Sequence, residues 1–250
     1  MIAAADTAWQ VVAASKPSVN HRKGHNEDAW LACSRLDRSL ILAIADGAGS
    51  ARCASAASRL AVARARNLLA TGPLPFGEPW HERLLTLLWG VRSTLLWEAE
   101  RGNGQAHDYA TTLLLTVVTT GELATLQLGD GAIVVRHRDG LLERPLQPVR
   151  GRHASETVFV TSDGAMEAAR TAVLPARELV GVALLTDGLE PVATSVATGA
   201  PHDPFFSPLF AFAGGDAPVR RSRELGAFLD TPDLNERTQD DKTLILAVRS

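Results

Sequence analysis

The sequence has little cysteine and no long apolar run. Its two cysteines, Cys33 and Cys53, are too few for a disulfide framework and lack the spacing of a zinc site. We expect each to be a small buried residue. No stretch of about 20 apolar residues predicts a transmembrane helix. Segment 1–15 lacks a basic start, and Asp6 interrupts its apolar run, so it does not resemble a signal peptide. These absences favour a cytoplasmic protein.

An excess of charge of either sign is also missing. The chain carries 25 Lys and Arg against 28 Asp and Glu, a formal net charge of −3 at pH 7. Such a balance does not indicate binding to nucleic acid or to a membrane surface. The sequence has no internal repeat and no low-complexity tail. Its 250 residues, 46% of them hydrophobic, suit one domain or two small ones, and we expect a single domain over 1–250.

What the sequence does contain is a series of apolar runs that end in turn residues. Four runs end in Asp-Gly, and a fifth follows one such pair and ends in another, which predicts the second arm of a hairpin. Two further runs are rich in β-branched and apolar residues and predict strands. The Asp-Gly runs cover 40–47, 124–131, 156–164 and 181–188, the hairpin arm covers 132–140, and the last two cover 111–120 and 242–250.

Helical patterns interrupt these strands. Residues 50–70 are rich in alanine, with three arginines spaced seven apart on one polar face. Residues 79–102 place leucines at helical spacing and end at a glycine. Shorter helices are expected around 205–212 and over 219–230. Strands first, then two helices, then more strands and helices predict an α+β fold with predominantly antiparallel sheet.

Carboxylates stand at the ends of several predicted strands. Strand ends can converge at one sheet edge, where carboxylates without compensating cations repel one another and their pKa values rise. A divalent cation relieves that repulsion, and oxygen-only ligands favour Mg²⁺ or Mn²⁺ over zinc. Taken singly, each Asp-Gly pair is more often a simple turn. The candidate carboxylates are Glu27, Asp28, Asp46, Asp187, Asp240 and Asp241.

Six short motifs, in this order, resemble the metal-dependent serine/threonine protein phosphatases of type 2C, and most closely a compact bacterial branch of them. No single motif is specific, but their order and strand contexts are. The resemblance extends over residues 16–248. The resemblance implies two packed, mainly antiparallel sheets flanked by helix pairs. The motifs are NEDA (26–29), ADGAGS (45–50), ATTL (110–113), GDGA (129–132), LLTDGLE (184–190) and DDKT (240–243).

The resemblance also implies a site with two Mg²⁺ or Mn²⁺ ions. It implies that Asp46 bridges the two ions and that the Gly47 carbonyl ligates one of them. Asp187 and Asp240 would complete the other ion's ligands. Asp241 stands where the family has Asn or Asp.

The resemblance implies two further roles, one for residues within the NEDA motif and one for residues just before it. Glu27 and Asp28 are expected to orient metal-bound water. Family members often place arginine where Lys23 stands, to bind substrate phosphate. Because lysine lacks a bidentate fork, either Lys23 holds phosphate more loosely or the adjacent Arg22 takes that role. A solvated basic loop is the alternative for both. Eukaryotic members have histidine where Ala48 stands, so either water or another acid would protonate the leaving group, or the enzyme would be slower with poor leaving groups.

The region after 129 departs further from the family pattern. Gly-Asp-Ser-Arg is reduced to GDGA, so Asp130 is either a ligand for a third ion or part of a plain hairpin turn. Asp187 follows Asp130 by 57 positions, which indicates a reduced flap. Asp163 occupies a similar Asp-Gly pair, but Asp187 ends the more continuous apolar strand and is preferred. Asp163 is then expected in a turn or at the start of a helix over 165–170.

The predicted function is hydrolysis of phosphoserine or phosphothreonine on proteins, in one step, by a hydroxide that bridges the two metal ions. Substrates would come from a serine/threonine kinase, and the enzyme would act as a monomer. Two alternatives remain. Lys23, Ala48 and GDGA suggest a catalytically weak phosphoprotein-binding regulator, against which the retained Asp46, Asp187 and Asp240 argue. A phosphatase for small phosphorylated metabolites is the other.

Overall fold

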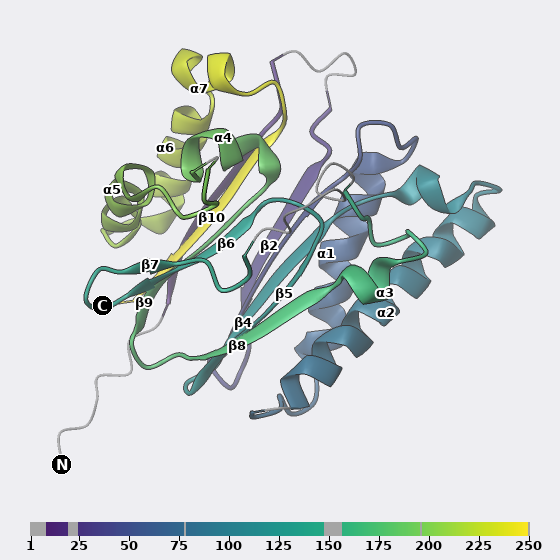
Figure 1. Cartoon of the computed structure of the whole chain (residues 1–250), viewed down its shortest axis with the longest axis horizontal. Helices are drawn as coiled ribbons and strands as arrows, with labels where there is room; N and C mark the ends of the chain where they lie inside the picture. Colours follow the sequence, from purple (N-terminus) through teal and green to yellow (C-terminus); the bar gives the residue numbers. More distant parts are fainter. Residues whose placement is uncertain (1–8, 20–24, 78, 148–156, 196, 250) are drawn as a thin grey trace.

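The computed structural model describes residues 9–19, 25–77, 79–147, 157–195 and 197–249. Within them, two five-stranded antiparallel sheets pack face to face, with helices on both outer faces (Figure 1). This arrangement confirms the predicted α+β class of two packed antiparallel sheets flanked by helix pairs. Over the same residues, none of the helices combines the length and apolarity that crossing a membrane requires.

The first sheet joins strands from opposite ends of the sequence, whereas the strands of the second sheet stand in chain order. In spatial order, the first sheet contains β1 (Gln10–Lys16), β10 (Lys242–Val248), β9 (Leu179–Leu185), β6 (Ala132–His137) and β7 (Leu142–Glu143). The second contains β2 (Asp28–Ser34), β3 (Leu40–Asp46), β4 (Leu113–Val118), β5 (Glu122–Leu128) and β8 (Arg170–Pro175). The predicted strands at 40–47, 111–120, 124–131, 132–140, 181–188 and 242–250 are therefore confirmed.

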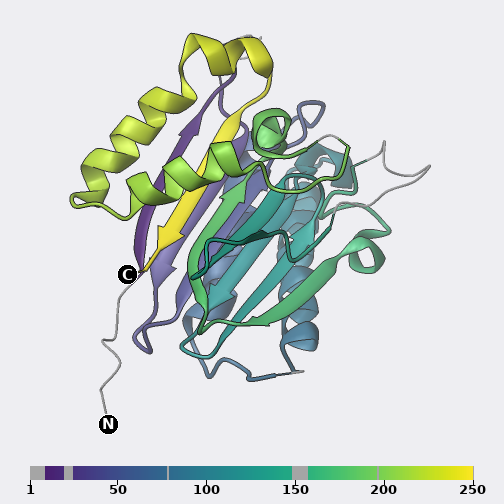
Figure 2. The same cartoon turned by 60° about the vertical axis from the view of Figure 1, so that its left-hand side comes forward.

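Two long helices cover the outer face of each sheet. α1 (Ala54–Ala70) and α2 (Pro79–Arg101) cover the second sheet, and α5 (Asp203–Ala213) and α6 (Pro218–Leu229) cover the first (Figure 2). All four match predicted helices to within a few residues. The shorter helices are η1 (Ala106–Tyr109), α3 (Ala165–Ala168), η2 (Asp187–Leu189), α4 (Glu190–Ala193) and α7 (Pro232–Arg237).

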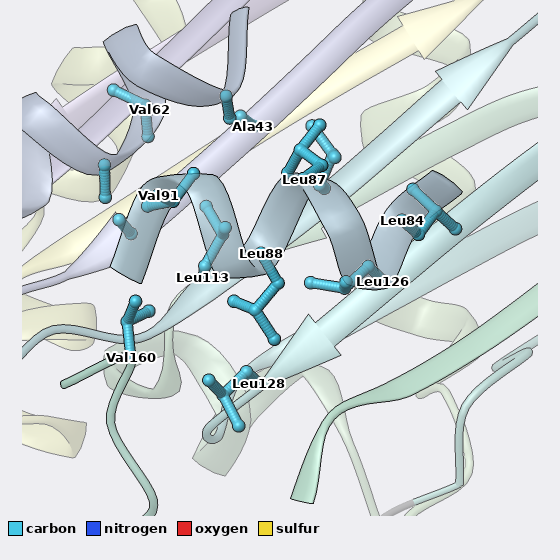
Figure 3. Close-up of a cluster of buried hydrophobic side chains, with 14 of the residues drawn as sticks. Ala43, Val62, Leu84, Leu87, Leu88, Val91, Leu113, Leu126, Leu128 and Val160 are labelled. Carbon is cyan, nitrogen blue, oxygen red and sulfur yellow. The ribbon is translucent and has the colours of Figure 1, made fainter. Parts of the chain in front are cut away.

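The continuous apolar character of β3 follows from its position between two cores. Alternate side chains of a strand face opposite sides of the sheet. Ile41 and Ala43 pack beneath α1 and α2, whereas Leu42 and Ile44 pack between the two sheets. Figure 3 shows the helix-side core, in which leucines of α2 meet side chains of β4 and β5. Since both faces are buried, the strand reads as an unbroken apolar run.

The hairpin predicted from 124–131 and 132–140 is wrong, because β5 and β6 belong to different sheets. Gly129 and Gly131 both have positive φ, +92° and +89°, and they carry the chain across from one sheet to the other. The Gln127 amide donates to the carbonyls of both glycines, at 3.2 and 3.0 Å. β5 instead forms its hairpin with β4, and β6 pairs with β7 and β9.

The strand predicted at 156–164 is also wrong. Its described part, 157–164, forms turns that lead into α3. α3 ends at Ala168, and β8 begins at Arg170, so the helix expected over 165–170 is shorter than predicted. One backbone hydrogen bond, from Val160 N to Thr111 O, ties these turns to the chain just before β4. Four strands, β1, β2, β7 and β8, were not predicted at all.

Asp241, which directly precedes β10, binds the chain on both sides of the connection between β1 and β2. Its side chain is 2% exposed. One carboxylate oxygen accepts the backbone N–H of Ser18 at 2.7 Å, and the other accepts that of Glu27 at 2.5 Å. β1 lies in the first sheet and β2 in the second, so this carboxylate links the two sheets at one edge.

We predict that Asp241→Ala lowers the free energy of unfolding by about 2–4 kcal/mol, because two buried N–H groups lose their acceptors. Asp241→Asn keeps one acceptor oxygen and should cost less. Urea unfolding of both variants measures the effect, with the exposed Asp216→Ala as the control. Equal midpoints for Asp241→Ala and the control would contradict this role.

Candidate metal centre

Four carboxylates from separate strand ends converge on one cavity of about 230 Å³. Asp46 ends β3, Asp187 follows β9, Asp240 precedes β10, and Asp130 follows β5. They meet because these ends of the two packed sheets lie at the same edge of the sandwich. The cavity is lined by Glu27, Asp46, Gly47, Ala48, Gly49, Ser50, Asp130, Thr157, Phe159, Asp187 and Asp240.

The glycines that follow Asp46 and Asp187 are required by packing. A Cβ at Gly47 would overlap the backbone carbonyl of Ala54 in α1, and a Cβ at Gly188 would overlap that of Asp241. At Gly49, by contrast, the nearest atom to such a Cβ is a Glu27 carboxylate oxygen at 3.6 Å. Close packing of the chain therefore explains Gly47, whereas at Gly49 a side chain would have room beside the cavity.

The backbone of Asp46 is held by the two threonines of the ATTL motif. Thr111 Oγ1 donates to the Asp46 carbonyl at 2.8 Å. The Asp46 N–H donates to Thr112 Oγ1 at 2.9 Å. No role was predicted for either threonine, although their motif was part of the family pattern. The position of Asp46 is thus set by β4 as well as by its own strand.

Asp28 lies behind the cavity and is not among its lining residues. It is the direct register partner of Asp46 in the β2–β3 pair. Its Oδ2 accepts hydrogen bonds from Thr186 Oγ1 at 2.8 Å and from Thr243 Oγ1 at 2.6 Å. Its Oδ1 is buried without a hydrogen-bond partner among the described residues. These threonines follow β9 and lie in β10, so Asp28 joins the two sheets just behind the cavity.

The remaining predicted residues differ in where the structure places them. Lys23 and Arg22 lie outside the described residues. Glu27 is on the cavity wall, and Asp130 accepts a hydrogen bond from Thr157 Oγ1 at 2.8 Å. Asp163 is fully exposed, is absent from the lining and pairs with Arg92 at 3.7 Å. Of the two Asp-Gly carboxylates compared above, the cavity therefore contains Asp187 only.

Burial and mutual repulsion raise the pKa values of three of these carboxyl groups. Burial raises the pKa of Asp28 to about 7, partly opposed by the hydrogen bonds from Thr243 and Thr186. Burial, with the nearby charges of Asp130 and Asp240, raises the pKa of Asp187 to about 7. Burial and three neighbouring aspartates raise the pKa of Asp46 well above its usual range. Without a cation, the cluster retains protons near neutral pH.

The donor set fits a hard divalent cation. Every candidate ligand is an oxygen, and buried Asp187 Oδ1 has no hydrogen-bond partner among the described residues. In the described ranges, no three His, Cys, Asp or Glu side chains are grouped so that they alone could hold a metal ion. Mg²⁺ commonly binds through one or two carboxylates and keeps several waters, so it does not need such a group.

Comparison with known proteins gives consistent matches. The chain matches the family Protein phosphatase 2C over residues 17–230. Serine/threonine-protein phosphatase 3 of Escherichia coli K12 is 32% identical over 254 residues, covering 96% of this chain and 98% of that protein.

Two solved structures share the fold. A bacterial serine phosphatase matches with a TM-score of 0.70 at 16% identity, covering 98% of each chain. The serine/threonine phosphatase of S. agalactiae matches with a TM-score of 0.71 at 14% identity, covering 97% of this chain and 100% of that one. The chain therefore belongs to the protein phosphatase 2C family, which confirms the family and the enzyme class that its motifs predict.

Proposed function

We propose that this protein removes phosphate from phosphoserine and phosphothreonine of protein substrates, using divalent cations bound in the carboxylate cavity. The observation that carries the proposal is the convergence of Asp46, Asp130, Asp187 and Asp240 on one cavity, in a chain of the protein phosphatase 2C family. Its E. coli relative, named a serine/threonine-protein phosphatase, supports the same substrate class.

The residues present fit a pair of Mg²⁺ or Mn²⁺ ions. Asp46 would be shared between them, the Gly47 carbonyl would bind one, and Asp187 and Asp240 would bind the other. Asp130 would be available to a third ion. Two ions bound there would supply a hydroxide nucleophile at neutral pH and offset the charge that develops on the phosphoryl group.

The chain's own residues would position water and substrate. The Glu27 carboxylate lies on the cavity wall, where it can accept hydrogen bonds from water. Asp28 sits behind Asp46, and its two threonine partners keep it in place. Ala48 offers no proton donor, so the leaving oxygen would take its proton from water. Phosphate binding by Arg22 or Lys23 stays a prediction.

Substrate proteins phosphorylated by a serine/threonine kinase are the partners that this proposal implies. The cavity wall also includes Phe159 and Ala48, which both pack against a small apolar cluster of Ala51, Ala54 and Ala110, so one side of the wall is apolar. Such a side would suit a peptide flanking the phosphoresidue better than a small, wholly polar metabolite. A monomer that binds neither nucleic acid nor membrane remains the expectation.

We predict that Asp46→Asn lowers Mn²⁺- or Mg²⁺-dependent phosphate release from a phosphothreonine peptide by at least ~100-fold, because it removes the shared carboxylate. Excess EDTA should abolish release by the unmodified protein. The matched control is Asp163→Asn, which changes an exposed Asp-Gly carboxylate outside the cavity and should leave activity intact. Full activity of Asp46→Asn would contradict the site. Absence of release by the unmodified protein, despite Mn²⁺ binding, would favour the regulator.

We also predict that the metal-free protein loses stability as pH rises from about 4 to about 8. Asp28 and Asp187 have folded-state pKa values of about 7, far above the ~3.9 of an unfolded chain. Within this window the folded state binds more protons than the unfolded state, so the free energy of unfolding falls with pH. Mg²⁺ replaces those protons, so it should stabilise the protein more at pH 8 than at pH 6.

Thermal unfolding in EDTA and in excess Mg²⁺, at about pH 6 and about pH 8, measures this effect. Asp187→Asn removes one of the three carboxyl groups of the cluster with raised pKa values and should flatten the dependence on pH in EDTA. A metal-free protein that unfolds at a higher temperature at pH 8 than at pH 6 would be the contrary result.

A further inference from the structure

A buried arginine outside every motif lies beside the carboxylate cluster. Arg144 follows the short strand β7, and only 4% of it is exposed. Its Nη2 donates to the Gly131 carbonyl at 2.5 Å and to Glu190 Oε1 at 3.0 Å. Arg144 is not among the residues that line the cavity. One guanidinium therefore joins two segments, each of which carries a cavity carboxylate.

The first of these segments is the turn that holds Asp130. Gly131 comes directly after Asp130, and its carbonyl also accepts a hydrogen bond from the Gln127 amide. A Cβ on Gly131 would approach the Leu185 carbonyl to 2.5 Å, and one on Gly129 would meet Thr112. The turn therefore packs closely against the start of β4 and the end of β9. Fixing the Gly131 carbonyl thus limits where Asp130 can point.

The second segment is the helical turn that begins at Asp187. η2 spans Asp187–Leu189, and Glu190 follows as the first residue of α4. Glu190 is three residues after Asp187, so both carboxylates lie on one side of this short helical stretch. Burial raises the pKa of Glu190, and Arg144 opposes that rise by pairing with it. The ion pair of Arg144 with Glu190, at 3.0 Å, therefore restrains the stretch that carries Asp187.

We propose that Arg144 is a positioning residue that sets the separation of Asp130 and Asp187 across the cavity, and so sets the affinity for divalent cations. This inference rests on the proposed function. Partners of this kind, one shell behind the ligands, commonly alter metal affinity by ~10–100-fold when removed. The GDGA motif carries no arginine of its own, and the guanidinium bound to its Gly131 carbonyl belongs to Arg144.

A purely structural role is the competing account. Buried ion pairs often add little net stability, and replacement of both partners by apolar residues is frequently tolerated. Removal of one partner alone, however, leaves a buried charge and can unfold the protein. A variant that removes both charges therefore separates the two accounts, because it restores folding without restoring the hydrogen bond to Gly131.

The experiment measures Mn²⁺ binding by calorimetry and the Mn²⁺ dependence of phosphate release for four variants. They are Arg144→Met, Glu190→Gln, the double variant Arg144→Met/Glu190→Met, and the control Arg138→Met. Arg138 pairs with Glu178 in an exposed ion pair at 3.6 Å. Each variant is first checked for folding by thermal unfolding, so that affinity is compared among folded proteins only.

We expect Mn²⁺ binding to weaken by ~10-fold or more in Arg144→Met and in the double variant, with kcat nearly unchanged at saturating Mn²⁺. Glu190→Gln, whose amide oxygen can still accept from Arg144, should lose less, and Arg138→Met should match the unmodified protein. Recovery of both stability and Mn²⁺ affinity in the double variant would overturn the proposal, as would unchanged affinity in Arg144→Met. If the unmodified protein binds no Mn²⁺, the proposed function falls, and this inference with it.

Discussion

Repulsion among carboxylates gathered at one edge of the sandwich is the constraint on which the rest of the structure depends. Asp28, Asp46 and Asp187 all have raised pKa values, and burial is the largest cause for each of them. Such a cluster opposes folding unless protons or cations offset its charge. The remainder of the chain must therefore supply enough stability to hold these groups together before any cation binds.

That stability comes from three stacked cores and from threonine hydroxyls placed next to the charges. Each sheet contributes one face to the core between the sheets and one to a core beneath its helices, so the central strands are buried on both sides. Thr111 and Thr112 hold the backbone of Asp46. Thr186 and Thr243 hold Asp28. At Thr186 and Thr243 a hydroxyl is suitable because it donates to a carboxylate without adding charge.

The sequence was most informative where a strand is buried on both faces. An unbroken apolar run followed by a carboxylate located the ends of β3 and β9, and with them Asp46 and Asp187, without knowledge of the pairing. The same rule failed at Gly129 and Gly131, because a turn that crosses between sheets has the same Asp-Gly signature as a hairpin. It missed β1, which pairs with β10 at the other end of the sequence, so local pattern does not reveal it. It also missed β2, although β2 pairs with β3, the next strand along the chain.

Arg144 illustrates a kind of residue that local sequence cannot identify. The neighbouring sequence does not distinguish it from the exposed Arg138 six residues earlier. Arg138 directly follows β6, and Arg144 directly follows β7. Only the fold brings its guanidinium to Gly131 and Glu190. A buried cation at this place has a cost in desolvation, which hydrogen bonds to a carbonyl and a carboxylate offset. Because Glu190 is one of the charges that raise the pKa of Asp187, Arg144 offsets part of that repulsion by pairing with Glu190, and it does so without lining the cavity that the cations would occupy.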